Sequence, residues 1–317
     1  MQITGTFIDE ISHDIPHQNW GKHEWDADFS HMKEIGIDSV FLIRSGFQKW
    51  LTYPSKILME EENCYKPPID LVELFLQLAE KHALNFYFGT YDSGNYWWKG
   101  NFQKEVDLNK KVIDEVWKKY GHYKSFKGWY LTQEVSRRTG KVIDLYAQMG
   151  KHCKGISNNL PIFISPWIDG KKAVAAASST LSKTDVVSIK EHEQEWSEIL
   201  DGIQHAVNAV AFQDGHVDYH ELPAFFEVNK KMADKYGLQC WTNAESFDRD
   251  MPIKFLPIKF EKLRLKLEAA RKAGYDKAIT FEFSHFMSPQ SAYPQAAHLN
   301  DRYKEYIREL KIQKLIN

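Results

Sequence analysis

Two stretches far apart in the chain share one pattern, an apolar run rich in aromatic residues that ends on a glutamate. They are Phe126–Glu134 and Leu238–Glu245. Each run has the length and composition of a buried strand. If both are parallel strands of one sheet, Glu134 and Glu245 meet at the same edge. Glycoside hydrolysis requires such a pair, because one carboxyl group protonates the leaving oxygen while the other acts on the opposite face of the sugar.

The surrounding sequence predicts elements that can hold this pair. An amphipathic helical segment, a glycine and then an apolar strand follow one another around Gly36, Gly237 and Gly274. Glycine can take the left-handed conformation that ends a helix and turns the chain into the next strand. Repeated helix-to-strand steps of this kind predict βα units around a parallel sheet.

Eight segments are predicted as strands. They are Ile3–Asp9, Ser39–Ser45, Asn85–Asp92, Phe126–Glu134, Pro161–Trp167, Val207–Asp214, Leu238–Glu245 and Lys277–Phe283. The predicted helices are Trp25–Ile35, Ile69–His82, Glu105–Tyr120, Lys141–Gly155, His192–Ile203, Leu222–Tyr236, Lys259–Ala273 and a closing C-terminal helix at Asp301–Lys314.

Eight strand-and-helix steps predict the α/β class and a (β/α)8 TIM barrel, with residues 1–317 as a single domain. The segment Asp185–Ile189 could be a ninth strand, but it would leave too little room for a helix after Trp167. We therefore interpret it as a loop or the start of a helix. An open doubly wound sheet is the alternative architecture. No glycine-rich phosphate loop follows any predicted strand, which favours the barrel.

The composition is that of an ordinary globular protein, with 43% hydrophobic and 26% charged residues. The formal net charge of −2 argues against a nucleic-acid partner, which would favour a basic surface. The chain has 10 Trp and 15 Tyr residues, and these side chains stack on sugar faces as well as fill cores. The composition therefore mildly favours a carbohydrate ligand.

The cysteines and the N-terminal residues bear on cellular location. Cys64, Cys153 and Cys240 are widely spaced and form neither a disulfide framework nor a CxxC motif. No apolar run approaches the roughly 20 residues that a membrane span needs, so no membrane association is expected. The N-terminus lacks the basic and apolar regions of a signal peptide. We expect a cytoplasmic protein as the chain stands, or a periplasmic or secreted one if a leader was removed.

Polar and acidic side chains gather where the predicted strands stop. These strand ends carry Asp9, Arg44, Tyr91, Asp92, Gln133, Glu134, Trp167, Asp214, Asn243, Glu245 and Glu282. Barrel active sites lie at this end of the strands, and charged groups are costly inside a sheet without partners. Any one of these residues could instead face solvent or cap the next helix. Together they predict a site at the carboxyl ends of the strands.

This layout resembles that of retaining glycosidases of clan A, in which the fourth-strand glutamate is the acid/base and the seventh-strand glutamate is the nucleophile. The chain also resembles an uncharacterised bacterial family of glycosidase-like TIM barrels. The residues that carry this similarity are Gly5–Asp9, Gly128–Glu134, Gln213–Gly215 and Trp241–Glu245. The resemblance implies that Glu134 is the acid/base and Glu245 the nucleophile.

Two positions depart from the pattern of the clan. Gln133 stands where clan members usually have an asparagine that bonds the sugar 2-hydroxyl. Asp214 stands where an aromatic residue or a histidine is expected. An aspartate there could raise the pKa of a neighbouring glutamate, or could itself be the second catalytic group.

Further side chains are expected to contact the sugar. The residues expected to stack on it are Tyr91, Trp129, Trp167 and Trp241, with Trp97 and Trp98 as a platform at the rim. Those expected to bond its hydroxyls or line its site are Asp9, Arg44, Asp92, Gln133, Asn243, Asp214, His216 and Glu282. Strand alternation adds a condition: if Glu134 points into the barrel, so does Tyr130, whereas Trp129 and Gln133 face the helices.

The sequence therefore predicts a retaining glycoside hydrolase that cleaves an oligosaccharide or polysaccharide without a cofactor. A nearby carboxylate is expected to raise the pKa of Glu134 and keep it protonated. One alternative is a carbohydrate-binding barrel without activity. Another is a metal-dependent hydrolase that uses His216, Asp218 and His220, but their spacing matches no specific zinc signature, so no metal is assigned. The sugar, its linkage and the oligomeric state stay open.

Overall fold

The computed structural model describes residues 1–12, 15, 17–171, 186–249 and 255–316. Eight parallel strands close a barrel in the order β1, β2, β5, β7, β8, β9, β10 and β13. Their bounds are β1 (Ile3–Ile8), β2 (Ser39–Leu42), β5 (Asn85–Gly89), β7 (Phe126–Leu131), β8 (Ile162–Ile164), β9 (Ala209–Gln213), β10 (Gln239–Asn243) and β13 (Lys277–Thr280). Each of the eight predicted strands is confirmed.

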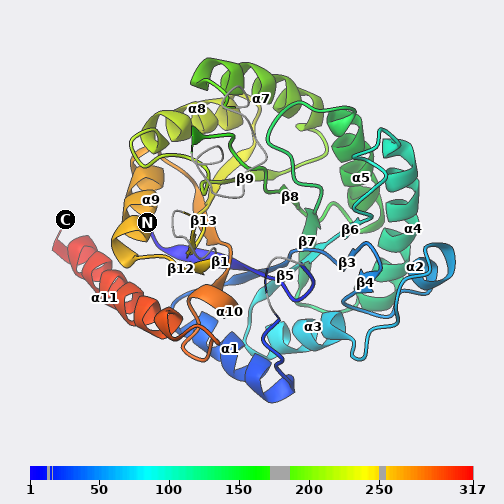
Figure 1. Ribbon diagram of the computed structural model, residues 1–317, viewed down its shortest axis with the longest axis horizontal. Coiled ribbons are helices and arrows are strands. Elements are labelled where there is room, and N and C mark those ends of the chain that lie inside the picture. Colours follow the sequence, from blue (N-terminus) through cyan, green and yellow to red (C-terminus); the bar gives the residue numbers. More distant parts are fainter. Residues whose placement is uncertain (13–14, 16, 172–185, 250–254, 317) are drawn as a thin grey trace.

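Helices form a ring around the strands, as the view along the barrel shows (Figure 1). Their bounds are α1 (Lys22–Glu34), α3 (Leu71–Lys81), α4 (Phe102–Tyr120), α5 (Val142–Ile156), α7 (Ile189–Ile203), α8 (Leu222–Lys235), α9 (Phe260–Lys272) and α11 (Pro294–Ile316). The fold is therefore the predicted (β/α)8 TIM barrel. In the part of the chain that the structure describes, no helix has the length and apolar character needed to cross a bilayer.

The glycines between helices and strands have the predicted conformation. Gly36, Gly237 and Gly274 have φ values of 87°, 69° and 79°. These values lie in the left-handed region, which glycine adopts without a steric penalty. The three positions follow α1, α8 and α9, and each turns the chain into the next strand.

The ambiguous segment Asp185–Ile189 does not add a barrel strand. Asp185 lies outside the described residues, and Val186–Ser188 have no regular structure. Ser188 is instead the N-cap of α7, since its side chain accepts a hydrogen bond from the backbone N–H of Glu191 at 3.2 Å. Serine is a favoured residue at this capping position. The interpretation as the start of a helix is therefore confirmed for the described residues.

The C-terminal helix closes the ring and holds the start of the chain. It begins at Pro294, earlier than the predicted Asp301, and proline is well tolerated in the first turn of a helix. Tyr303 accepts a hydrogen bond from the backbone N–H of Ile3 at 2.6 Å. Tyr306 accepts one from the N-terminal amine at 2.9 Å. These bonds fix β1 against α11.

The barrel wall is packed on both faces. Inside it, one cluster consists of Phe7, Phe41, Ile43, Tyr87, Tyr130, Phe163, Ala209, Ala211, Trp241 and Ile279. The rings of Phe41 and Tyr87 stack there with centroids 4.4 Å apart. Outward-facing side chains such as Trp129 belong to the larger core under the helices. Because side chains fill the barrel interior, a ligand can bind only at the ends of the strands.

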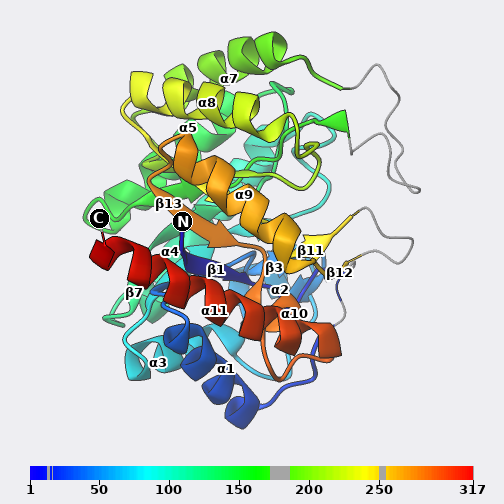
Figure 2. The ribbon, with the colours of Figure 1, turned by 90° about the vertical axis from the view of Figure 1, so that its left-hand side faces the viewer.

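Short elements extend the barrel at the carboxyl ends of its strands. The small sheet consists of β3 (Gly46–Phe47), β4 (Trp50–Leu51) and β6 (Tyr91–Asp92). A second pair is β11 (Phe247–Asp248) and β12 (Leu256–Pro257), and two short helices are α2 (Lys56–Glu61) and α10 (Phe283–Phe286). The side view places β3, β11 and β12 toward one end of the barrel (Figure 2). Of these additions, only Tyr91–Asp92 was predicted as a strand, as the end of the predicted segment Asn85–Asp92.

Candidate active site

A pocket of about 210 Å³ lies at the carboxyl ends of the barrel strands. Its walls are Asp9, Ser12, Ile15, Ile43, Arg44, Glu134, Gln213, Glu245, Phe247, Arg249, Phe255 and Phe281. They come from the ends of six barrel strands and from the β11–β12 pair. The structure therefore brings Glu134 and Glu245 into one pocket, together with Asp9 and Arg44.

Glu134 follows β7 and is held by a residue one layer below it. The hydroxyl of Tyr130, inside the barrel, donates a hydrogen bond to Glu134 Oε1 at 2.9 Å. Burial raises the pKa of Glu134, and the opposing effects of the Arg44 charge and of the Tyr130 hydrogen bond are smaller. The sequence predicted that a nearby carboxylate raises this pKa. The charge of Asp92 does so, but burial is the largest cause of the rise.

Glu245 has the opposite electrostatic environment. Arg249 binds its carboxylate through two hydrogen bonds, from Nε to Oε2 and from Nη2 to Oε1, both at 2.8 Å. Burial alone would raise the pKa of Glu245, but the charge and hydrogen bonds of Arg249, aided by the charge of Lys266, lower it. The surroundings of the two glutamates thus shift their pKa values in opposite directions, upward at Glu134 and downward at Glu245.

A glycine makes room for the Glu245 carboxylate. A Cβ atom on Gly215 would lie 1.6 Å from Glu245 Oε2 and 2.2 Å from its carboxyl carbon. Any larger residue would have to displace the carboxylate from the pocket wall. Gly215 follows β9 directly after Asp214, so the loop after β9 sets the position of Glu245.

Asp214 lies behind the pocket and supports the backbone of Glu245. Its Oδ1 accepts hydrogen bonds from Lys266 Nζ at 2.7 Å and from the backbone N–H of Glu245 at 3.2 Å. Lys266, on α9, also donates to the carbonyl oxygen of Glu245 at 3.1 Å. Burial raises the pKa of Asp214, while the charge of Lys266 opposes the rise. This buried ion pair fixes the end of β10.

Asp9 and Arg44 line the pocket, and each has one buried polar atom without a hydrogen-bond partner in the described structure. Asp9 Oδ1 accepts hydrogen bonds from the backbone N–H groups of Ile11 and Ser12 at 3.0 and 2.9 Å. Its Oδ2, like the Nε of Arg44, is buried and has no hydrogen-bond partner among the residues that the structure describes. Buried polar atoms are costly when unpaired, so these two are suited to bind a polar ligand.

Strand alternation and depth in the barrel together explain why several expected sugar contacts lie elsewhere. Gln133 faces the helices, where its Nε2 donates to Glu105 on α4 at 3.0 Å. Trp241 points inward but lies in the packed barrel interior. Asn243 is also buried and donates to Ser165 Oγ at 3.0 Å. Together with Asp214, these residues lie under or behind the pocket and do not line it.

The expected inward direction of Tyr130 and the outward directions of Trp129 and Gln133 are confirmed. Trp129 lies in the core outside the barrel wall and donates through Nε1 to Ser157 Oγ at 3.1 Å. It is therefore not available to stack on a ligand in the pocket.

Glu282 and the residues at the end of the third barrel strand serve local structure. Glu282 accepts hydrogen bonds from the backbone N–H groups of Ser284 and His285 and so caps α10. Tyr91 is buried, and its hydroxyl donates to the carbonyl of Gln48 at 2.7 Å. Asp92 accepts a hydrogen bond from Trp97 Nε1 at 3.1 Å.

The remaining predicted contacts lie near the rim. The rings of Trp97 and Trp98 are tilted by 31° with centroids 4.2 Å apart, and Trp98 is 61% exposed. Trp167 and His216 meet edge to face at 5.1 Å. His216 is close enough to Glu245 for its charge to contribute to the lowered pKa of that carboxyl.

Sequence reasoning missed Arg249, Gln213 and the aromatic wall of Phe247, Phe255 and Phe281. Arg249 is four residues beyond Glu245, and its role depends on how the loop after β10 turns back. Gln213 precedes the more conspicuous Asp214, and alternation along β9 could have indicated that only one of these two neighbours faces the pocket. Its Nε2 donates to the carbonyl of Ser165 at 2.7 Å.

The loop His216–His220, which was considered for metal binding, does not bring its His and Asp side chains together around one point. Asp218 accepts a hydrogen bond from the backbone N–H of His220 at 2.9 Å, and His220 is exposed. Across the described ranges, no group of three or more His, Cys, Asp and Glu side chains could hold a metal ion. No metal ligand set can therefore be named in this part of the chain.

A larger hollow of about 630 Å³ lies on the outside of the barrel, between α9 and α11. Its charged side chains pair with one another: Arg264 contacts Glu268 at 2.7 Å and Glu309 at 3.9 Å. It is distant from the strand ends and has no pair of carboxyl groups in contrasting environments. We therefore assign the chemistry to the smaller pocket.

Comparison with known proteins shows the fold and the family to which the chain belongs. The TIM-barrel fold of the chain is shared with solved structures of a mannanase and a xylanase. Residues 3–293 match the family described as a domain of unknown function (DUF4434), and the chain belongs to this family. None of the curated proteins compared with the chain matches it.

The chain is similar to a Bacteroides thetaiotaomicron protein that was provisionally named an alpha-L-fucosidase. The two are 66% identical over 97% of this chain and 93% of that one, with a TM-score of 0.92. An endo-beta-1,4-mannanase from Thermotoga petrophila has a TM-score of 0.60 at 12% identity, covering 96% of this chain and 76% of that one. An intracellular xylanase from Thermoanaerobacterium saccharolyticum has a TM-score of 0.52 at 12% identity, covering 87% and 84%. These two distant similarities establish the shared fold alone.

Proposed function

We propose that the protein is a retaining glycoside hydrolase in which Glu134 is the acid/base and Glu245 the nucleophile. The observation that carries this proposal is the opposed pKa shifts of two glutamates in one pocket. Burial raises the pKa of Glu134, whereas Arg249 outweighs burial at Glu245 and lowers its pKa. A retaining mechanism, like an inverting one, needs a protonated carboxyl and an ionised one at the start of the reaction, and the positions of the two glutamates after β7 and β10 match the retaining arrangement.

The reaction then proceeds in two displacements. Glu134 donates its proton to the glycosidic oxygen as the bond from that oxygen to the anomeric carbon breaks, and a Glu245 oxygen bonds to this carbon. Glu134, now ionised, accepts a proton from water, and this water displaces Glu245 from the anomeric carbon. The sugar leaves with its original anomeric configuration, and both glutamates return to their starting states.

The pocket walls support binding of a sugar in front of this pair. Asp9 Oδ2 and Arg44 Nε are unpaired within the described structure and can bond hydroxyl groups. Phe247, Phe255 and Phe281 provide an apolar wall, which suits the C–H groups of a sugar ring. The similarity to clan A hydrolases in fold adds support to carbohydrate as the substrate class.

Chemical rescue by azide tests both roles. We first expect the wild-type protein to hydrolyse at least one member of a panel of nitrophenyl glycosides. On that substrate, Glu245→Ala should regain activity with azide and form a glycosyl azide of inverted configuration. Glu134→Ala should form a glycosyl azide of retained configuration, because its glycosyl-enzyme intermediate still forms. Wild-type turnover by either variant without azide would contradict the assignment.

A further inference from the structure

Three segments at the rim expose aromatic rings around the small sheet β3–β4–β6. In chain order they are residues 47–50, 62–65 and 95–98. Trp50 is 61% exposed and Tyr65 56%, and their rings meet edge to face at 5.1 Å. Trp98 is as exposed as Trp50 and lies against Trp97. Of the six large hydrophobic side chains that are exposed in the described structure, these three are the aromatic ones. Apolar surface gathered in this way marks a binding site more often than chance exposure.

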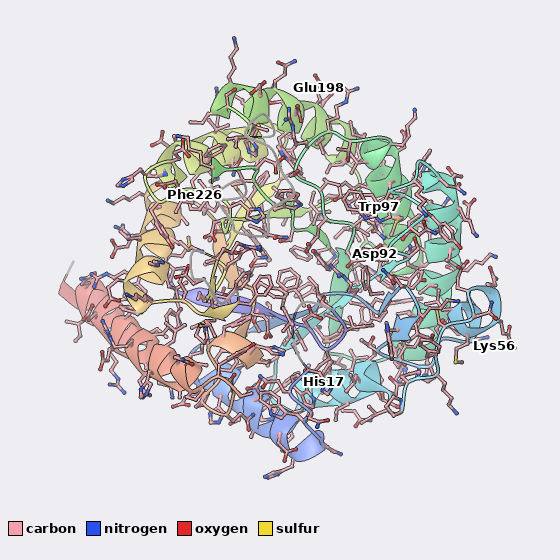
Figure 3. The ribbon with its side chains drawn as sticks, in the orientation of Figure 1. His17, Lys56, Asp92, Trp97, Glu198 and Phe226 are labelled. Atoms are coloured by element: carbon pink, nitrogen blue, oxygen red, sulfur yellow. The ribbon has the colours of Figure 1, made fainter. Side chains whose placement is uncertain are left out.

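The pairing of the small sheet places these rings on one face. Phe47 on β3 is paired with Trp50 on β4 and with Asp92 on β6. Residues that are directly paired project from the same face of a sheet. Trp97 joins that face because its Nε1 donates to Asp92. Figure 3 labels Asp92 and Trp97 next to each other, on the side of the barrel where the small sheet lies in Figure 1.

This face starts at the edge of the pocket. The guanidinium carbon of Arg44 lies 5.0 Å from the centre of the Phe47 ring. Arg44 also lines the pocket that contains Glu134 and Glu245. A ligand that occupies the pocket beside Arg44 can therefore continue over Phe47 toward Trp50.

The segments that carry the exposed rings are bonded to one another. The backbone N–H of Tyr65 donates to the carbonyl of Lys49 at 2.8 Å, and Lys49 Nζ donates to the carbonyl of Glu62 at 2.7 Å. The hydroxyl of Tyr96 donates to Glu62 Oε2 at 2.5 Å and so ties the third segment to the second. Backbone segments joined in this way need little reordering on binding.

We propose that Phe47, Trp50, Tyr65, Trp97 and Trp98, which we name the rim platform, bind a carbohydrate chain that continues from the pocket. The substrate is then a glycan of several sugar units and not a single sugar on a small leaving group. A sugar ring presents a face of C–H groups that packs on the negative face of an aromatic ring. The direction of the chain rests on the proposed function, which places the reacting sugar beside Arg44.

The polar surroundings of the rim platform favour a carbohydrate over an apolar protein surface. Gln48, Asn63 and Asn95 lie in the same three segments and are exposed. Amide groups beside aromatic rings can bond sugar hydroxyls. An apolar partner would leave these groups without hydrogen bonds, at a cost in free energy.

Native gels that contain soluble xylan, galactomannan, galactan or fucoidan test the proposal. The protein carries Glu134→Gln throughout, so that the polysaccharide in the gel is not digested. We expect at least one polysaccharide to retard this protein, and Trp50→Ala to weaken the apparent affinity at least tenfold. Trp50→Phe should restore most of it. Leu265→Ala is the matched control, because Leu265 lies on α9 and is 53% exposed.

The outcomes separate the rim platform from the proposed function. If no polysaccharide retards the protein, or if Trp50→Ala and Tyr65→Ala are retarded as strongly as their parent, the rim platform is contradicted. The azide experiment can still succeed in that case, and the proposed function then stands alone. If retardation depends on Trp50 but no glycoside is hydrolysed, the rim platform stands and the proposed function fails. Unchanged unfolding temperatures confirm that the variants are folded.

Discussion

Tyr130 and Arg249 each control the protonation of one glutamate in the pocket. Both stabilise the ionised form of their partner, Tyr130 through one hydrogen bond and Arg249 through two with a full charge. Glu134 must be protonated to act as an acid, and Glu245 must be ionised to act as a nucleophile. Removal of either partner should therefore shift one limb of the pH–rate profile and leave the other in place.

Tyr130→Phe tests the control of Glu134. The hydrogen bond from Tyr130 lowers the pKa of Glu134, so its loss raises that pKa and keeps the acid protonated to higher pH. We expect the basic limb of kcat/KM to move up by about one pH unit or less. Tyr53→Phe is the control, because it removes a similar bond, to Glu115 at 3.1 Å, outside the pocket. A basic limb that moves equally in both variants would contradict the assignment.

Arg249→Gln tests the control of Glu245. Without the arginine, burial is opposed less and the pKa of Glu245 rises, so the nucleophile is protonated at a higher pH. We expect the acidic limb of kcat/KM to move up by about 1–3 pH units. Arg264→Gln removes a comparable pair with Glu268 on the outer surface and should leave the profile unchanged. An acidic limb that stays in place would show that Arg249 does not set this pKa.

At the scale of elements, the loop after β9 and helix α9 position the end of β10. Gly215 leaves space for the Glu245 carboxylate, and Lys266 and Asp214 bind the Glu245 backbone. The placement of the nucleophile thus depends on three segments that are distant in sequence. A change in any one of them should lower activity.

Gly215→Ala tests this dependence. The added Cβ would overlap the Glu245 carboxyl group, which must then move. We expect kcat/KM to fall by about 10²-fold or more, since a shift of about 1 Å at a reacting group can have this effect. Gly155→Ala on α5 is the matched control, because nothing lies within 4 Å of its added Cβ. That variant should keep full activity and gain up to about 1 kcal/mol in unfolding free energy.

The sequence was informative about elements that repeat and less so about those that occur once. Helix–glycine–strand steps and buried apolar runs predicted the eight strands, because periodicity and glycine chemistry are local properties. Glu134 and Glu245 could be paired because strands of one barrel end at one rim. The small sheet β3–β4–β6 and the contact of Arg249 with Glu245 depend on how single loops fold back. The residue types within those loops predicted neither the small sheet nor the contact of Arg249 with Glu245.

Alternation explains which expected contacts line the pocket. Asp9 and Arg44 do so, whereas Gln133 lies one residue out of phase with Glu134 and faces α4. Asn243 is in phase with Glu245 but one layer deeper in the barrel. Phase could be inferred from the sequence, but depth could not, because it depends on how far each strand extends toward the rim.

Across the whole molecule, buried carboxyl groups make stability depend on pH. Burial raises the pKa of Glu105 from 4.5 to about 7. An acid whose pKa is higher in the folded state takes up a proton on folding, so stability falls as pH rises from about 4.5 to about 7. The shift corresponds to about 3 kcal/mol at most.

Glu105→Gln should therefore flatten the pH dependence of stability. We expect the wild-type unfolding free energy to decrease between pH 5 and pH 7.5, roughly the window of the shift, and the variant to lose less over this range. Glu61→Gln, an exposed residue of α2, should follow the wild type. Parallel pH curves for wild type and Glu105→Gln in denaturant titrations would contradict the expectation.

The most direct test of the central claim is to trap the covalent intermediate. A panel of 2-deoxy-2-fluoro glycosides with good leaving groups slows breakdown of the glycosyl-enzyme, and mass spectrometry then locates the attached sugar. We predict one sugar per protein, bound to Glu245, and no adduct in Glu245→Gln. An adduct on another residue, or none from the fluorinated analogue of a glycoside that the wild-type protein hydrolyses, would contradict the account.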